Sequence, residues 1–262
     1  MLKIRLIPVL LLQDGLLVRS QNFSFHQIIG NPIHEVRRFN EWGVDEIVYL
    51  DISRGDAYDQ RREDHKIHGL NDPFAILTEV SRTCFVPLTW GGRIRTLEDI
   101  QRRIAGGADK VTLNTAAFRT PELITAGAQL FGSQAIVVSI DARRDVSGTT
   151  EVFVEGGREA TGMAPSEWAR QAESRGAGEI LIQSIDRDGM GQGYDLKLIE
   201  EVASAVQVPV IVLGGVGRYE HYVDAVRAGA SAVAAANIWH FKELSDQGGK
   251  RALRKAGVDV RD

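Results

Sequence analysis

The sequence of 262 residues is poor in cysteine and has no excess of positive charge. Its only cysteine, Cys84, excludes a disulfide within the chain, and we interpret it as a buried, inert thiol. The 31 Lys and Arg residues are outnumbered by 35 Asp and Glu, which gives a net charge of −4. A nucleic-acid partner is therefore not expected, because such proteins normally carry a basic field.

Long apolar runs are also missing, since no stretch reaches the roughly 18 residues of a membrane span. The short apolar run at the N-terminus lacks a small-residue cleavage site and is better interpreted as a first strand. These absences predict a cytoplasmic chain without a membrane partner. No metal site or cofactor is expected, because the histidines show no ligand spacing with carboxylates. They are His26, His34, His65, His68, His221 and His240.

What the chain does contain is an internal repeat. EIVYLDISRGD, from Glu46, returns as EILIQSIDRDG from Glu179, and VPLTWGGRIR, from Val86, returns as VPVIVLGGVG from Val208. Each copy has the pattern of a strand, a Gly-Gly loop, a helix and a strand. Two similar halves predict a closed symmetric sheet with two similar binding sites, and the chain has the usual length of a (β/α)₈ barrel.

Short β-branched runs alternate with amphipathic patterns along the chain. Strands are predicted near 4–12, 46–51, 85–90, 110–113, 135–141, 179–184, 209–213 and 231–235, and helices at 33–43, 122–130 and 167–175, with a last helix capped by Gly257. We therefore predict one (β/α)₈ TIM barrel domain over residues 1–262, made of two half-barrels with parallel strands. The polar segment 53–72 is long for a connecting loop, and is either an active-site lid or a surface insertion.

Two glycine pairs follow predicted strands, and glycine lets a backbone approach an anion closely. These pairs are Gly91-Gly92 and Gly214-Gly215, and the next strand of each half ends at Asn114-Thr115 and Ala236-Asn237. We interpret the four pairs as two phosphate sites on opposite sides of the barrel mouth, with simple tight turns as the alternative.

Carboxylates at strand ends form a second group, which comprises Asp51, Asp141, Asp186 and Asp188. Acid–base catalysis needs a carboxylate held rigidly near the substrate. Asp141 is the predicted catalytic residue, while Asp51 and Asp186 are predicted to position the substrate.

Charged residues also stand where strands begin, at the opposite end of a barrel. They are Arg5, Glu46, Lys110 and Glu179. The alternation of sign fits either a salt-bridge plug or a gate.

Taken together, the motifs GNPIHEV, DEIVYLDI, GGADKVTLNTAAF, FGSQAIVVSIDA, GAGEILIQSIDRDG and IWHF resemble the cyclase subunit of imidazole glycerol phosphate synthase, over nearly the whole chain. The resemblance implies a glutaminase partner at the N-terminal face of the barrel. It also implies an ammonia gate at the four charged positions, Arg5, Glu46, Lys110 and Glu179, and a bis-phosphorylated ribonucleotide at the mouth.

The chain departs from that family at the mouth. The family's IPCLDV becomes IPVLLL, which places Leu11 where the resemblance implies a catalytic aspartate. The family's first-loop lysine corresponds to Arg19, and the third glycine of its GGG motif to Arg93. These changes resemble divergent paralogues that serve amidination in bacterial surface-polysaccharide (lipopolysaccharide O-antigen) synthesis.

Four functions stay open at this point. The first is an ammonia-using synthase subunit for surface-glycan amidination, and the second is a genuine cyclase of histidine biosynthesis whose second acid–base group has moved, for example to Asp14. The third is a non-catalytic partner that activates a glutaminase. A sugar-phosphate isomerase is the fourth, although it has no use for the charged ring.

Overall fold

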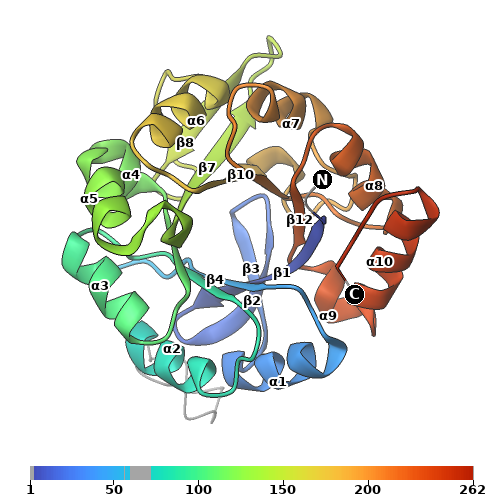
Figure 1. Cartoon of the computed structure of the whole chain (residues 1–262), viewed down its shortest axis with the longest axis horizontal. Coiled ribbons are helices and arrows are strands. Elements are labelled where there is room, and N and C mark those ends of the chain that lie inside the picture. The colour runs from blue at the N-terminus through green and yellow to red at the C-terminus, as the bar shows by residue number, and fades with distance from the viewer. Residues whose placement is uncertain (1–2, 56, 60–71, 262) are drawn as a thin grey trace.

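Eight parallel strands close into a barrel in the computed structural model, which describes residues 3–55, 57–59 and 72–261 (Figure 1). Hydrogen-bonded neighbours follow the order β1, β4, β5, β6, β7, β10, β11 and β12, and β12 pairs back with β1. The barrel strands are β1 (Arg5–Gln13), β4 (Ile47–Asp51), β5 (Leu88–Gly91), β6 (Lys110–Leu113), β7 (Ile136–Arg144), β10 (Glu179–Ser184), β11 (Val210–Leu213) and β12 (Ala232–Ala235). All eight predicted strands and the (β/α)₈ fold class are confirmed, with ends that move by a few residues at most.

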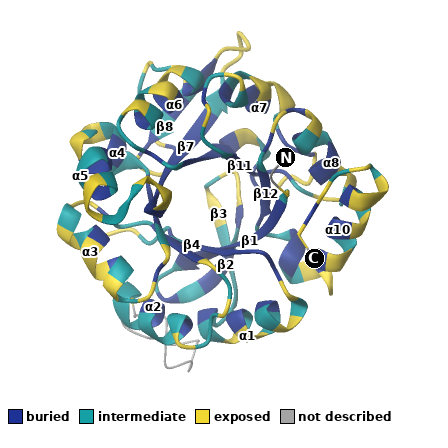
Figure 2. Cartoon of the chain, viewed as in Figure 1, coloured by how far each residue is buried: buried dark blue, intermediate teal, exposed yellow. Residues whose placement is uncertain are grey.

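Helices surround the barrel, with their exposed faces turned outward (Figure 2). They are α1 (Pro32–Trp42), α2 (Pro73–Ser81), α3 (Leu97–Ala105), α4 (Thr115–Arg119), α5 (Glu122–Phe131), α6 (Pro165–Ser174), α7 (Leu196–Ala203), α8 (Glu220–Arg227), α9 (Ile238–Phe241) and α10 (Ser245–Lys255), with 3₁₀ turns η1 (Ser133–Ala135) and η2 (Ile185–Arg187). None of the helices in the described ranges is long and apolar enough to cross a bilayer.

The helix starts follow local capping chemistry. Asn31 accepts a hydrogen bond from the backbone N–H of Ile33, and Pro32 occupies the first turn of α1, as the Asn-Pro pair predicts. Pro165 starts α6 slightly before the predicted position, because proline favours the first helical turn. The last helix ends just before Gly257, which adopts a left-handed φ of 78°.

Both sides of the barrel wall are apolar. On β1, Leu6, Leu10 and Leu12 pack toward the helices, whereas Ile7, Val9 and Leu11 belong to a second cluster formed by side chains from around the barrel. Because side chains alternate along a strand, this second cluster fills the lumen. The lumen is therefore largely apolar between its two ends, with Thr112 and Ser139 as buried polar side chains on the same face of their strands as Lys110 and Asp141.

Two antiparallel hairpins leave the barrel, and the sequence interpretation missed both. The first consists of β2 (Leu16–Gln21) and β3 (Phe25–Gly30). In the second, β8 (Thr150–Val154) pairs with the end of β7, and β9 (Glu159–Ala160) pairs with β8. Asp14 and Gly15 both have positive φ, 51° and 83°, as in a two-residue hairpin turn. This turn joins β1 to β2, so the Asp-Gly pair was a usable signal for the point where the chain turns back from the barrel wall into β2.

The long segment predicted as a lid or insertion, residues 53–72, lies in large part outside the described residues. His65 and His68 also lie outside them.

Candidate active site

Most of the predicted mouth residues gather at one end of the barrel, because the carboxyl ends of parallel strands meet there. Asp51 ends β4, Gly91 ends β5, Asn114 follows β6, Asp141 lies in β7 and Gly214 follows β11. The hairpin of β2 and β3 reaches across this end, since Ser20 is bonded to residues that follow β10 and β12 (Figure 1).

Asp141 is the most perturbed carboxyl of the mouth. It is 6% exposed, and its Oδ2 accepts a hydrogen bond of 2.9 Å from the side-chain amide of Asn114. Burial is the main reason why the pKa of Asp141 rises to about 7. The hydrogen bond from Asn114 lowers this pKa, and the negative charge of Asp188 raises it further. A carboxyl with this pKa can donate or accept a proton near neutral pH, as the predicted catalytic role requires.

Leu11 shares the lumen with this carboxyl and is 5% exposed. It lies near the end of β1, paired in register with Val18 of β2 and Leu50 of β4. The position where the resemblance implies an aspartate therefore presents only hydrocarbon to the mouth.

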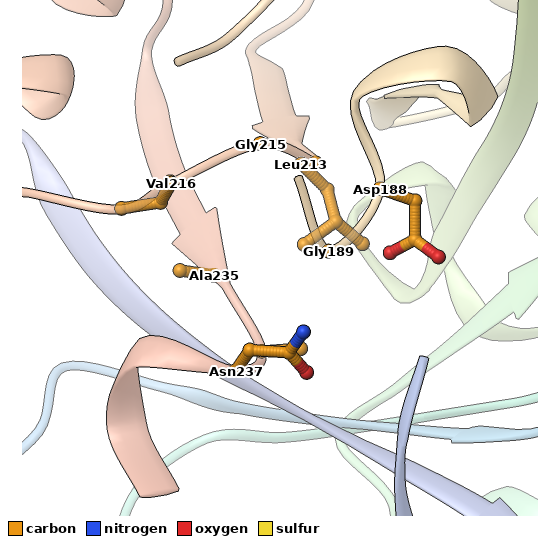
Figure 3. Close-up of a pocket in the computed structure, with 9 residues that line it drawn as sticks. Asp188, Gly189, Leu213, Gly215, Val216, Ala235 and Asn237 are labelled. Carbon is orange, nitrogen blue, oxygen red and sulfur yellow. The ribbon is translucent and has the colours of Figure 1, made fainter. Parts of the chain in front are cut away.

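A small cavity opens beside the second glycine pair (Figure 3). Its lining comprises Asp188, Gly189, Leu213, Gly214, Gly215, Val216, Ala235, Ala236 and Asn237. Asp188 and Asn237 supply the only polar side chains of that lining, and no lysine or arginine belongs to it. Any anion held there would rely on backbone N–H groups.

The two glycine pairs are also required by the backbone itself, apart from any ligand. Gly214 and Gly215 both have a φ of 101°, and a Cβ on Gly215 would overlap the carbonyl of Gly193, whose N–H donates to Gly215 at 2.7 Å. In the first half, Gly92 has a φ of 79°, and its Cβ would overlap the carbonyl of Asp51. Both halves thus use a glycine pair to press one loop against the neighbouring strand end.

Asp186 and Asp188 have different surroundings, although they are two residues apart. Asp186 accepts the backbone N–H of Arg144 at 2.8 Å, its side chain is 43% exposed, and it does not line the cavity. Asp188 is 5% exposed and lines the cavity. The structure favours Asp188 over the predicted Asp186 as a residue that faces a ligand.

Several other side chains that were predicted to contact the substrate already have partners within the protein. The two oxygens of Asp51 accept bonds from the Tyr58 hydroxyl, at 2.8 Å, and the Ser53 N–H, at 3.0 Å. The Thr115 hydroxyl accepts the N–H of Glu155. Arg19, on β2, has its guanidinium 5.6 Å from the centre of the Phe241 ring. These side chains hold loops of the mouth together.

At the opposite end, the four charged residues form one closed ring. Arg5 contacts Glu46 and Glu179 at 2.7 Å each, and Lys110 contacts the same carboxylates at 3.1 and 3.0 Å. The hydroxyl of Thr89 adds a bond of 2.8 Å to Glu46. Three of these ion pairs join strands that are not neighbours, so the ring spans the base of the barrel.

The ring is largely shielded from solvent, with side-chain exposures between 2% and 16%. Burial alone would lower the pKa of Arg5, but the charges and hydrogen bonds of Glu179 and Glu46 outweigh it and raise that pKa. Two cations and two carboxylates balance in charge, so the ring has no net charge.

The chain is thus a (β/α)₈ barrel with buried carboxyls at the C-terminal ends of its strands, the end at which enzymes of this fold have their active sites, and an ionic ring at the other end. Residues 5–245 match the family model described as "Histidine biosynthesis protein". The chain belongs to this family.

Named relatives cover nearly the full length. Imidazole glycerol phosphate synthase subunit HisF from Thermobifida fusca is 43% identical, over 99% of both chains. The subunit of the same name from Caulobacter vibrioides is 45% identical over all of this chain and 97% of the relative, and that from Gluconacetobacter diazotrophicus is 42% identical with the same coverage. The resemblance to the cyclase subunit is thus confirmed at the level of the family.

Proposed function

We propose that this chain is the ammonia-using synthase subunit of a glutamine amidotransferase complex. The observation that carries the proposal is the closed ring of Arg5, Glu46, Lys110 and Glu179, at the end of the barrel opposite Asp141. A glutaminase subunit docked at the N-terminal face would release ammonia at this ring. The whole chain, residues 1–262, would act as one barrel domain.

The lumen suits ammonia transfer because it is largely apolar between the ring and the mouth. Neutral NH₃ crosses such a space more readily than NH₄⁺, whose desolvation is costly. At the mouth, Asp141 would exchange protons with the reacting groups of a bis-phosphorylated ribonucleotide. The glycine loops and Asn114 would position its phosphates.

Cyclase activity in histidine biosynthesis is our first choice of reaction. The three named relatives, which match over nearly their full length, are imidazole glycerol phosphate synthase subunits, and the matching family model is that of a histidine biosynthesis protein. Leu11 supports a second candidate, amidination in surface-polysaccharide synthesis, since the mouth lacks the carboxylate that the resemblance implies for cyclisation. A purely activating partner would have no use for the buried Asp141.

The test supplies ammonium salt and the bis-phosphorylated ribonucleotide substrate of imidazole glycerol phosphate synthase to the purified chain. We expect turnover without the glutaminase, a loss of about 10²- to 10⁴-fold in Asp141→Asn, and a gain in Leu11→Asp. Product is followed by chromatography.

An inactive wild type with an active Leu11→Asp variant would exclude the cyclase reaction for the natural chain and favour amidination. If Asp141→Asn matched the wild type, the proposed role of Asp141 would be wrong. If, in addition, no glutaminase bound the N-terminal face, the complex itself would be excluded.

A further inference from the structure

The substitution at position 11 leaves a deficit in proton transfer. When ammonia adds to a carbonyl carbon and water leaves, a C–N bond forms and the C–O bond breaks. Two protons leave nitrogen, and oxygen gains two. One carboxyl cannot be base and acid at the same moment, and Leu11 can be neither. A second group at the mouth would let base and acid act within the same step.

We infer that Asp188 is this second acid–base group, an inference that rests on the proposed function. Asp188 follows β10 and η2, is 5% exposed, and lines the cavity beside Gly214 and Gly215 (Figure 3). Asp141 is paired in register with Gln183 of β10, the strand that leads to Asp188. The charge of Asp188 contributes to the raised pKa of Asp141.

The bonding of Asp188 leaves one oxygen for a ligand. Its Oδ2 accepts the Ser20 hydroxyl at 2.6 Å and the Phe23 N–H at 3.2 Å, whereas its Oδ1 has no hydrogen-bond donor in the described part of the chain. The same carboxyl faces His26 of β3 and Asp141 of β7. Burial raises the pKa of Asp188. The hydrogen bonds from Ser20 and Phe23 and the charge of His26 lower this pKa, but burial has the larger effect.

Other carboxyls of the mouth are less suited. One oxygen of Asp14 accepts the N–H of Asp59, and the backbone N–H of Asp14 donates to the Ser53 hydroxyl. Both bonds attach the Asp14 turn to the loop that follows β4. Both oxygens of Asp51 already accept hydrogen bonds. Asp186 is bound by the backbone N–H of Arg144 outside the cavity.

The hairpin of β2 and β3 fixes the carboxyl in place. Ser20 and Phe23 lie in this hairpin, and the Asn237 amide donates to the Ser20 carbonyl at 3.0 Å. A hairpin lying across the mouth therefore orients Asp188. Orientation and proton transfer can be separated, because Ser20→Ala removes a donor but keeps the carboxyl.

The kinetic test uses the full chain, ammonium salt and the same ribonucleotide, with kcat and KM measured across pH. Asp188→Asn should lower kcat by about 10²-fold or more, leave KM within a few-fold, and remove one limb of the pH profile. Ser20→Ala should lose far less and keep both limbs. Adding Leu11→Asp to Asp188→Asn should recover at least about tenfold. A higher KM with an unchanged pH profile would reduce Asp188 to a positioning residue and overturn the inference.

A second measurement needs no substrate and separates this inference from the proposed function. Carboxyl carbons of ¹³C-Asp-labelled protein are titrated by NMR in the wild type and in Asp188→Asn. Coupled carboxyls shift each other, so the apparent pKa of Asp141 should fall in the variant. A wild type without turnover would refute the function, whereas an unmoved Asp141 titration would refute the pairing.

Discussion

At the scale of the residue, chemistry at the mouth depends on what surrounds each carboxyl. Asp141 and Asp186 are both aspartates at strand ends, yet one is buried against Asn114 and the other lies half-exposed beside Arg143 and Arg144. The low-dielectric surroundings of Asp141 favour its neutral form, which raises its pKa to about 7.

The raised pKa of Asp141 predicts a pH-dependent stability. A carboxyl whose pKa rises from 3.8 to about 7 on folding stabilises the fold below pH 4, and this contribution disappears as pH rises through 7. Asp141→Asn should therefore increase the free energy of unfolding at pH 8, by up to about 4 kcal/mol, with little change at pH 4.

Urea unfolding at the two pH values measures this difference. Glu200→Gln, on the exposed surface of α7, is the control and should have a small effect at both. A variant less stable than the wild type at pH 8 would show that the Asn114 hydrogen bond outweighs the burial of the charge.

At the scale of the element, each half-barrel depends on a loop that presses against its neighbour. Gly92 lies against the backbone of Asp51, and Gly215 against that of Gly193. Both positions combine a positive φ with a contact that leaves no room for a Cβ. The repeat in the sequence thus corresponds to a repeated close approach of backbones.

Gly92→Ala should destabilise the chain by about 3–5 kcal/mol, because left-handed strain and overlap with the Asp51 carbonyl add together. Gly43 is the matched control, with a φ of 71° and no atom within 4 Å of the place that a Cβ would take. Gly43→Ala should lose only roughly 1–2 kcal/mol. Equal losses in thermal or urea unfolding would show that backbone conformation, and not the close approach, requires glycine at Gly92.

At the scale of the whole molecule, the ring joins both halves of the barrel at its base. Arg5 and Glu46 come from β1 and the start of β4, Lys110 from β6 and Glu179 from β10. Each carboxylate contacts both cations, so the charges balance only as a set. The ring is thus a structural link as well as the proposed ammonia entrance.

Glu46→Gln should destabilise the barrel by about 3–5 kcal/mol, because Arg5 and Lys110 would share one remaining carboxylate in a buried site. Glu201→Gln removes the partner of Lys197 on the surface, at 3.9 Å, and should change stability by less than about 1 kcal/mol. Urea unfolding compares the two. A Glu46→Gln variant as stable as the control would mean that solvent screens the ring.

The barrel could be predicted from local sequence patterns. Its strands are local apolar runs, its helices are marked by caps such as Asn31-Pro32, and the repeat indicated two halves. The sequence also placed the ring residues at strand starts, because a parallel barrel sends all such starts to one end. The Asp14-Gly15 turn was visible too, but its hairpin was missed because the strand pattern continued through it.

The surroundings of the mouth residues became visible only in the folded chain. The choice between Asp186 and Asp188 depends on Arg144 and Ser20, which are distant in the chain. The amide of Asn114 is bonded to Asp141, and Asp51 is closed off by Tyr58. Strand and helix patterns follow from neighbouring residues, whereas burial and hydrogen bonding of a loop side chain depend on which distant segments pack against it.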